Sequence, residues 1–363
     1  MARKLKSDAV LFSTTLLLLV IGMAWVYSAS AVKDGASLVM RQGVFMAIGL
    51  AGAFAAMKTD YRRLCNRRVA IWVVGATTAV LVGVLLFGHT VGGGRRWIGW
   101  GGLGIQPSEL AKLVAVFFVA TVLERRLEDR EALEPAWFQA GAVLATFALL
   151  IFLERDMGGG IVLLAAGSAI IFVSGLAYRW VGIAASAGLP VLTAVLLLVP
   201  HTRQRLETWV NPYLDYYGKG YQTIQSYIAL GTGGLWGKGF LASVQKNSFL
   251  PEPQNDYIFA VIAQEQGLIG ATVVLLCFLV IIWRGLRVAR RAPDAFGSLL
   301  AVGITALFGI PALIHMGVVT NLLPAKGISL PLVSAGGSSL IVSLVAMGVL
   351  LNISQQASVT AVE

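Results

Sequence analysis

The stretch PEPQNDYIFAVIAQEQG, residues Pro251 to Gly267, passes from a loop into an apolar segment that continues to Trp283. The two prolines disfavour helix at its start. The apolar part is long enough to cross a bilayer. Asp256 lies where the loop becomes the membrane segment, and a carboxylate there is costly unless it has partners, water or a function. The stretch therefore predicts a membrane helix with a candidate functional acid at its boundary.

The rest of the chain has the same apolar character. Its 363 residues have a mean hydropathy of +0.78, and 13% of them are charged, which is about half the ~25% of soluble domains. Several apolar runs reach the ~20 residues that cross a bilayer. The predicted fold is an all-α, polytopic membrane protein.

We predict about ten transmembrane helices in a single integral membrane domain that spans residues 1–363. A large extracytoplasmic loop, about 201–256, lies between helices 7 and 8. The predicted segments are 10–32, 42–57, 69–87, 108–123, 137–153, 159–175, 179–200, 257–283, 297–319 and 338–353.

Lysine and arginine in the loops predict the orientation. With the N-terminus inside, sixteen basic residues lie in cytoplasmic segments and six in short outer loops, as the positive-inside rule requires. Both termini are then cytoplasmic, and Asp256 faces outward. The net charge of +10 is spread between apolar segments, which argues against a nucleic-acid partner. Cys65 and Cys277 indicate neither a disulfide framework nor a metal knuckle.

Four stretches resemble one family of membrane proteins. They are GGGRRWIGWGGLGIQPSELAK, GYQTIQSYIALGTGGLWGKGF, SVQKNSFLPEPQNDYIFAVIAQEQG and NLLPAKGISLPLVSAGGSSL. Together they resemble the SEDS family, the peptidoglycan glycosyltransferases of bacterial shape, elongation, division and sporulation. The resemblance runs from the first predicted helix to the tenth. It implies a place in the bacterial cytoplasmic membrane.

Within that family the chain is more similar to the division branch, FtsW, than to the elongation branch, RodA. The division branch implies a place at the septum. The ending LPAKGISLPLVSAGGSSL and the loop GYQTIQSYIALGTGGLWGKG carry this likeness. Three departures weaken it: QNDYIF where members commonly have HTDFIF, Ala335 in place of a frequent tyrosine, and Arg155 in place of a frequent proline.

The resemblance implies polymerisation of lipid II, a disaccharide-pentapeptide on a polyprenyl diphosphate. It puts the essential aspartate at Asp256, as the base that deprotonates a sugar hydroxyl. From the residues alone, Asp256 could also be the N-cap of the following helix. The implied partners are a class B penicillin-binding protein with transpeptidase activity and other divisome or elongasome membrane proteins.

Positive groups should bind the diphosphate. Arg95 and Arg96 follow three glycines, and arginine forks match phosphate oxygens; we favour Arg96, with interfacial snorkelling as the alternative. Glu109 and Lys112 share a helix face, as a substrate contact or a structural ion pair. Lys246 and Lys326 could each meet diphosphate or be solvated loop charges.

Carboxylates and hydroxyls complete the candidate set. Asp156 resembles a recurrent acid of the family and ranks above Glu154, although both could form a self-satisfied cluster with the neighbouring arginine. Ser338 and Ser339 open the last helix, where free N–H groups favour anions, or act as ordinary caps. Glu265 should pair within the bundle rather than with Asp256.

No organic cofactor is indicated, and a divalent cation (Mg or Mn) could bind the carboxylates. Two other classes of function fit a ten-helix bundle. A lipid II flippase would show polar residues near the midplane, whereas here they concentrate at the outer face. A scaffold would only recruit the transpeptidase.

Overall fold

The computed structural model describes residues 7–31, 35–91, 94–99, 104–125, 127, 130–176, 179–180, 182, 186, 200–218 and 220–360. Nine long helices in this part match nine of the ten predicted segments. They are α1 (Ala9–Ser30), α2 (Gly35–Lys58), α3 (Arg67–Phe87), α4 (Pro107–Glu124), α5 (Arg130–Leu153), α6 (Met157–Val173), α11 (Ile258–Arg291), α12 (Ala295–Val319) and α13 (Gly337–Thr360). The predicted segment 179–200 falls almost entirely outside the described residues.

The helices are those of an integral membrane protein. Among the described residues, seven helices are long and apolar enough to span a bilayer: α1, α2, α3, α5, α11, α12 and α13. The apolar α6 has 17 residues, and α4 has 18 residues that include three charged side chains.

Polar residues mark where several of these helices begin. Asp8, Asn66 and Asp294 are N-caps of α1, α3 and α12, and each side chain accepts a hydrogen bond from a backbone N–H of the first turn. Such caps satisfy N–H groups that have no partner within the helix. Each cap stands directly before or near an apolar run, so local sequence sets these boundaries.

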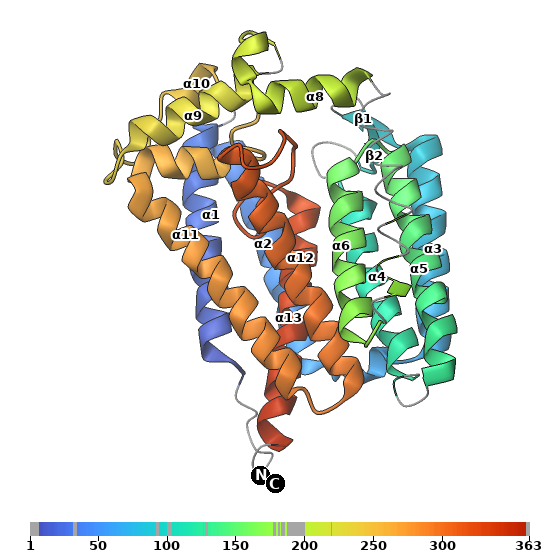
Figure 1. Cartoon of the computed structure of the whole chain (residues 1–363). Helices are drawn as coiled ribbons and strands as arrows, with labels where there is room; N and C mark the ends of the chain where they lie inside the picture. The colour runs from blue at the N-terminus through green and yellow to red at the C-terminus, as the bar shows by residue number, and fades with distance from the viewer. Residues whose placement is uncertain are drawn as a thin grey trace.

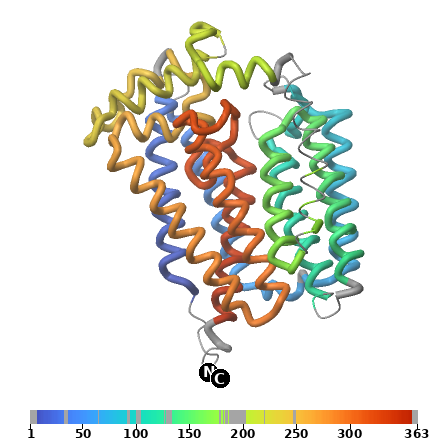
Figure 2. Tube along the Cα trace, viewed as in Figure 1, coloured from blue at the N-terminus to red at the C-terminus, as the bar shows by residue number. Residues whose placement is uncertain are grey.

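The long helices form two groups that meet at α12 (Figures 1 and 2). One group contains α1, α2, α11 and α13, and the other contains α3, α4, α5 and α6; α12 packs on α11, α6 and α4. The most extensive contact between two helices is that of α2 with α13. A side chain at Gly52 would come within 2.8 Å of Val345, so a small residue permits this approach.

Short elements cover one end of the bundle, which we call the distal end because the start of α1 and the end of α13 lie at the other (Figure 1). They are β1 (His89–Val91), β2 (Gly94–Trp97), α8 (Pro200–Val210), η2 (Pro212–Asp215), α9 (Tyr221–Gly233) and α10 (Gln245–Ser248). The 201–256 segment, expected as a loop, is thus largely helical in its described part. The β1–β2 hairpin was also not predicted.

The helix α11 is bent near its start. Gly267 has φ +67° and ψ −163° within the helix, a conformation that glycine adopts readily. A side chain at Gly267 would strike the backbone of Leu235 and Gly237. The first part of α11 therefore lies across the distal end, and the remainder spans the bundle (Figure 1).

Candidate functional site

Asp256 lies at the distal end, two residues before α11 begins at Ile258. The loop that carries it is held by the segment before α13: the Ser334 hydroxyl donates to the Asn255 carbonyl over 2.7 Å, and the Ala335 N–H donates to the Gln254 carbonyl over 2.9 Å. The Asp256 carboxylate rests against Gly327, where an added Cβ would come within 2.5 Å of Oδ2. It is not the N-cap of α11, because that position is Tyr257.

The surroundings of Asp256 make it a stronger base than an exposed aspartate. Its pKa is raised to about 6: burial is the largest cause, the carboxylates of Glu252 and Asp156 act in the same direction, and the Arg96 guanidinium opposes them. A pKa near 6 leaves the carboxylate mostly ionised at neutral pH while improving its proton affinity, which suits a general base.

The β1–β2 hairpin separates the two candidate arginines. Strand neighbours point to opposite faces: Arg95 is exposed, whereas Arg96 is partly buried. The Nε of Arg96 is buried without a hydrogen-bond partner. Arg96 is close enough to Asp256 and Glu154 to lower the pKa of both carboxyls. The structure therefore brings Arg96, and not Arg95, into the charged cluster around Asp256.

Asp156 joins the starts of α6 and α4. It caps α6 by accepting from the Gly159 N–H over 2.9 Å. It also accepts from Gln106 Nε2 over 3.0 Å and from the Ser108 hydroxyl over 3.4 Å. Asp156 is 9% exposed, so these contacts hold the start of α4 against the start of α6.

Glu154, which the sequence ranked below Asp156, has the more unusual environment of the two. It is fully buried, and both carboxylate oxygens lack a hydrogen-bond partner. Its pKa is raised to about 8: burial is the largest cause, the Asp156 charge acts in the same direction, and Arg96 opposes both. Such a group stays protonated at neutral pH, because an isolated buried carboxylate is costly. In the sequence, Glu154 could be singled out by its position two residues before Asp156, the N-cap of α6.

The segment between α12 and α13 brings in Lys326. The pKa of Lys326 is lowered to about 8: burial is the largest cause, the charges of Arg205 and Arg96 act in the same direction, and Asp156 opposes them. His315, near the end of α12, fixes this segment through a 2.6 Å hydrogen bond between Nδ1 and the Ile328 carbonyl. Lys326 is therefore partly buried beside other cations, rather than a solvated loop charge.

The remaining predicted site residues at the distal end are two serines of α13 and an ion pair on α4. The Ser338 hydroxyl accepts from the Gln106 N–H over 3.2 Å, which ties α13 to α4; Ser339 is partly buried beside it. Lys112 and Glu109 form an ion pair of 2.8 Å on α4, with side chains 15% and 13% exposed. This pairing matches the structural alternative for these two residues.

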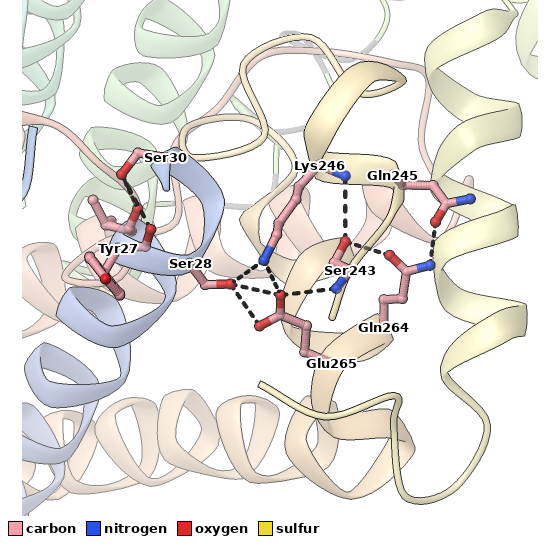
Figure 3. A network of polar contacts seen from close by, with 9 residues as sticks. Tyr27, Ser28, Ser30, Ser243, Gln245, Lys246, Gln264 and Glu265 are labelled. Carbon is pink, nitrogen blue, oxygen red and sulfur yellow. Dashed lines mark hydrogen bonds and ion pairs between the residues drawn. The ribbon is translucent and has the colours of Figure 1, made fainter. Parts of the chain in front are cut away.

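Lys246 lies outside the Asp256 cluster, in a buried ion pair with Glu265. Its ammonium contacts Glu265 Oε1 over 2.6 Å and the Ser28 hydroxyl over 2.7 Å. The Ser28 hydroxyl donates to both Glu265 oxygens, and the Ser243 N–H donates to Oε1 (Figure 3). The side chains of Lys246 and Glu265 are 2% and 0% exposed. Glu265 pairs within the bundle, as predicted, and Lys246 is neither a solvated charge nor part of the Asp256 cluster.

The described residues contain no group of three or more His, Cys, Asp or Glu side chains placed to hold a metal ion. Protein ligands alone therefore do not fit a metal site in this part of the chain. A cation there would take most of its ligands from substrate phosphates and water, as Mg²⁺ commonly does.

The fold and this cluster define a multi-pass helical membrane protein with a perturbed aspartate, an arginine and a lysine gathered at one end. Comparison with known proteins is consistent with that class. A family model described as "Cell cycle protein", for FtsW, RodA and SpoVE, matches residues 8–359. The chain belongs to this family.

Similar proteins cover nearly the whole chain. Stage V sporulation protein E of Bacillus subtilis is 39% identical over 359 residues, 97% of this chain and 98% of that protein. The probable peptidoglycan glycosyltransferase FtsW of Geobacter metallireducens is 37% identical over 353 residues, 96% of this chain and 94% of its own.

Solved structures share the fold. One chain from a peptidoglycan synthase complex has a TM-score of 0.81 at 28% identity, covering 97% of this chain and 99% of its own. The rod shape determining protein RodA of Thermus thermophilus has a TM-score of 0.71 at 27% identity, covering 97% of each chain.

Proposed function

We propose that this protein is a peptidoglycan glycosyltransferase that polymerises lipid II at the outer face of the bacterial cytoplasmic membrane. The observation that carries the proposal is the setting of Asp256, whose carboxylate lies against the Gly327 backbone with its pKa raised to about 6. The similar proteins named peptidoglycan glycosyltransferase support the class of reaction.

The reaction forms one bond and breaks another at the same carbon. The 4-hydroxyl of the acceptor sugar attacks the anomeric carbon of the donor, and Asp256 takes the hydroxyl proton. The bond from that carbon to the diphosphate oxygen breaks, the electron pair leaves with the polyprenyl diphosphate, and the configuration inverts. A correctly placed base contributes about 10²–10⁴-fold to such a rate.

Arg96 and Lys326 would neutralise the leaving diphosphate. Arg96 lowers the pKa of Asp256, and the charges of Asp156 and Arg96 act on Lys326. Preorganised cations stabilise charge that develops in a transition state. Arg96 has a buried Nε without a partner, so a phosphate oxygen would supply an acceptor. Asp156 would position the start of α4 rather than touch substrate, since its oxygens already accept three hydrogen bonds.

We propose that both termini are cytoplasmic and that the distal end faces outward, from the distribution of Lys and Arg along the chain. The partner would be a class B penicillin-binding protein, together with other divisome membrane proteins. The resemblance to FtsW favours a role in division at the septum over elongation. A tagged copy that gathers at division sites would support this role, and one spread along the cell cylinder would contradict it.

The test of activity uses purified protein, with and without its co-expressed class B partner, and fluorescent lipid II. Wild type should form glycan strands on a gel, and Asp256→Ala should form none at an unchanged thermal midpoint. Glu207→Gln is the matched control, because Glu207 is an exposed acid on α8, at the same end of the bundle. Lipid flipping in proteoliposomes without polymer would instead favour a transporter.

A further inference from the structure

A pocket of about 480 Å³ lies at the distal end beside the Asp256 cluster. Its walls come from α8, from the turn after η2, from the start of α9 and from the segment before Lys326. The lining residues are Arg205, Thr208, Trp209, Asp215, Gly218, Gln222, Thr223 and Ala325. This volume lies within the ~300–1,000 Å³ range of small-molecule sites, and none of the lining residues has a role in the reaction described above.

Two connections link the pocket to Asp256. Ala325, in the pocket wall, is two residues from Gly327, which touches the Asp256 carboxylate. Gln222, on another wall, accepts a 3.4 Å hydrogen bond from the hydroxyl of Tyr257, the residue after Asp256. A molecule in the pocket would therefore contact residues that neighbour the groups holding the proposed base.

The wall formed by α8 is fixed in place. Trp209 Nε1 donates to the Asn321 carbonyl over 3.0 Å, and Asn321 Nδ2 donates back to the Trp209 carbonyl over 3.1 Å. This reciprocal pair holds α8 against the end of α12. The pocket is thus largely preformed, which reduces the conformational entropy lost on binding.

The chemistry of the lining favours a carbohydrate. Thr223 and Gln222 offer a hydroxyl and an amide that both donate and accept, as sugar hydroxyl and acetamido groups do. The Thr208 hydroxyl donates to the Gln204 carbonyl and can still accept. Trp209 adds an aromatic surface. Arg205 and Asp215 contribute one charge of each sign, so the lining has no excess of cations for a diphosphate and is too polar for a lipid tail.

We propose that this pocket is a saccharide subsite that holds sugar units of the growing glycan beside Asp256. The inference rests on the proposed polymerase function, because it assigns the sugar to that reaction. A polymer made at this end must leave the membrane, and α8, which lines the pocket, is one of the elements that cover the distal end (Figure 1).

The test measures binding of the GlcNAc–MurNAc disaccharide to the purified full-length protein by saturation-transfer NMR. Wild type should bind it, and Arg205→Ala should weaken binding about tenfold or more, as expected for lost hydrogen bonds to a charged group. Arg203→Ala is the matched control, because Arg203 is on the same helix but is exposed and pairs with Glu207. Thr208→Val tests the wall without changing the charge near Lys326.

Product length gives a second readout. Arg205→Ala and Thr208→Val should make shorter strands than wild type, and Arg203→Ala should not. Asp256→Asn should bind the disaccharide normally while making no polymer. Binding that is equal in Arg205→Ala, Thr208→Val and Arg203→Ala, or absent in wild type, would overturn the subsite. Binding that depends on Arg205 in a wild-type protein without polymerase activity would support the pocket and contradict the proposed function.

Discussion

Replacing Lys246 by methionine should strongly destabilise the distal end. The ammonium of Lys246 lies 2.6 Å from Glu265 Oε1, and both side chains are almost completely buried. Removing one partner of such a pair leaves an uncompensated buried charge and costs about 3–5 kcal/mol. The unfolding entropy is about 2.1 cal/mol/K per residue. Dividing the lost free energy by this entropy for all 363 residues gives a fall of roughly 4–7 °C in the thermal midpoint.

The assay is thermal unfolding of the purified protein in detergent. Lys238→Met is the matched control, because Lys238 is an exposed lysine in the same region, and it should shift the midpoint by less than about 1 °C. The double variant with Lys246→Met and Glu265→Leu should recover about 1–3 kcal/mol of the loss from either single change, since neighbouring sites couple. Recovery stays partial because Ser28 and Ser243 lose their shared acceptor.

A loss below about 1 kcal/mol in Lys246→Met would refute the reasoning. A double variant no more stable than the less stable single variant would also refute it. Either result would show that the ammonium reaches water or another acceptor, so that the contacts in Figure 3 do not hold the pair in isolation.

Three other perturbations test the site. Because Asp256 must be ionised to act and its pKa is about 6, the polymerisation rate should fall about tenfold per pH unit below that value. Arg96→Gln removes a cation that lowers this pKa, so the acid limb of the pH–rate profile should move to higher pH. An acid limb that does not move would contradict the coupling between Arg96 and Asp256. The pKa of Glu154 is about 8 in the folded state and 4.5 in the unfolded state, so the folded state binds an extra proton between these values. The wild type should therefore lose up to about 4–5 kcal/mol of stability as pH rises from 4.5 to 8, and Glu154→Gln should abolish that loss. An equal slope of unfolding free energy against pH in both proteins would show that Glu154 is ionised. Gly327→Ala places a Cβ against the Asp256 carboxylate and should lower the rate at least about tenfold through misplacement of the base, with an unchanged thermal midpoint; a wild-type rate would show that the carboxylate moves freely.

The membrane segments could be predicted because each is encoded locally. Runs of about 20 apolar residues require no knowledge of the rest of the fold, and nine of them are helices in the described part of the chain. The bend in α11 could not be predicted in the same way. Gly267 lies inside an apolar run, and its conformation is required by contact with Leu235 and Gly237 about thirty residues earlier.

The candidate site shows the same division between local and distant information. Asp256 could be selected from its boundary position and from the family resemblance. The partner of Lys246 could not, because Glu265 and Ser28 are 19 and 218 residues away in the sequence. The burial of Glu154 likewise depends on β2 of the unpredicted hairpin: a side chain at Gly94 would strike the Glu154 carbonyl. Such contacts between distant segments are set by packing rather than by periodicity.

The most direct measurement is the initial rate of glycan formation from fluorescent lipid II by the purified wild type and by Asp256→Asn, with its partner present. The substitution keeps the shape of the side chain and removes its ability to accept the proton. We predict that the rate falls at least about 10²-fold while the thermal midpoint is unchanged. A rate within about tenfold of wild type would contradict the assignment of Asp256 as the general base.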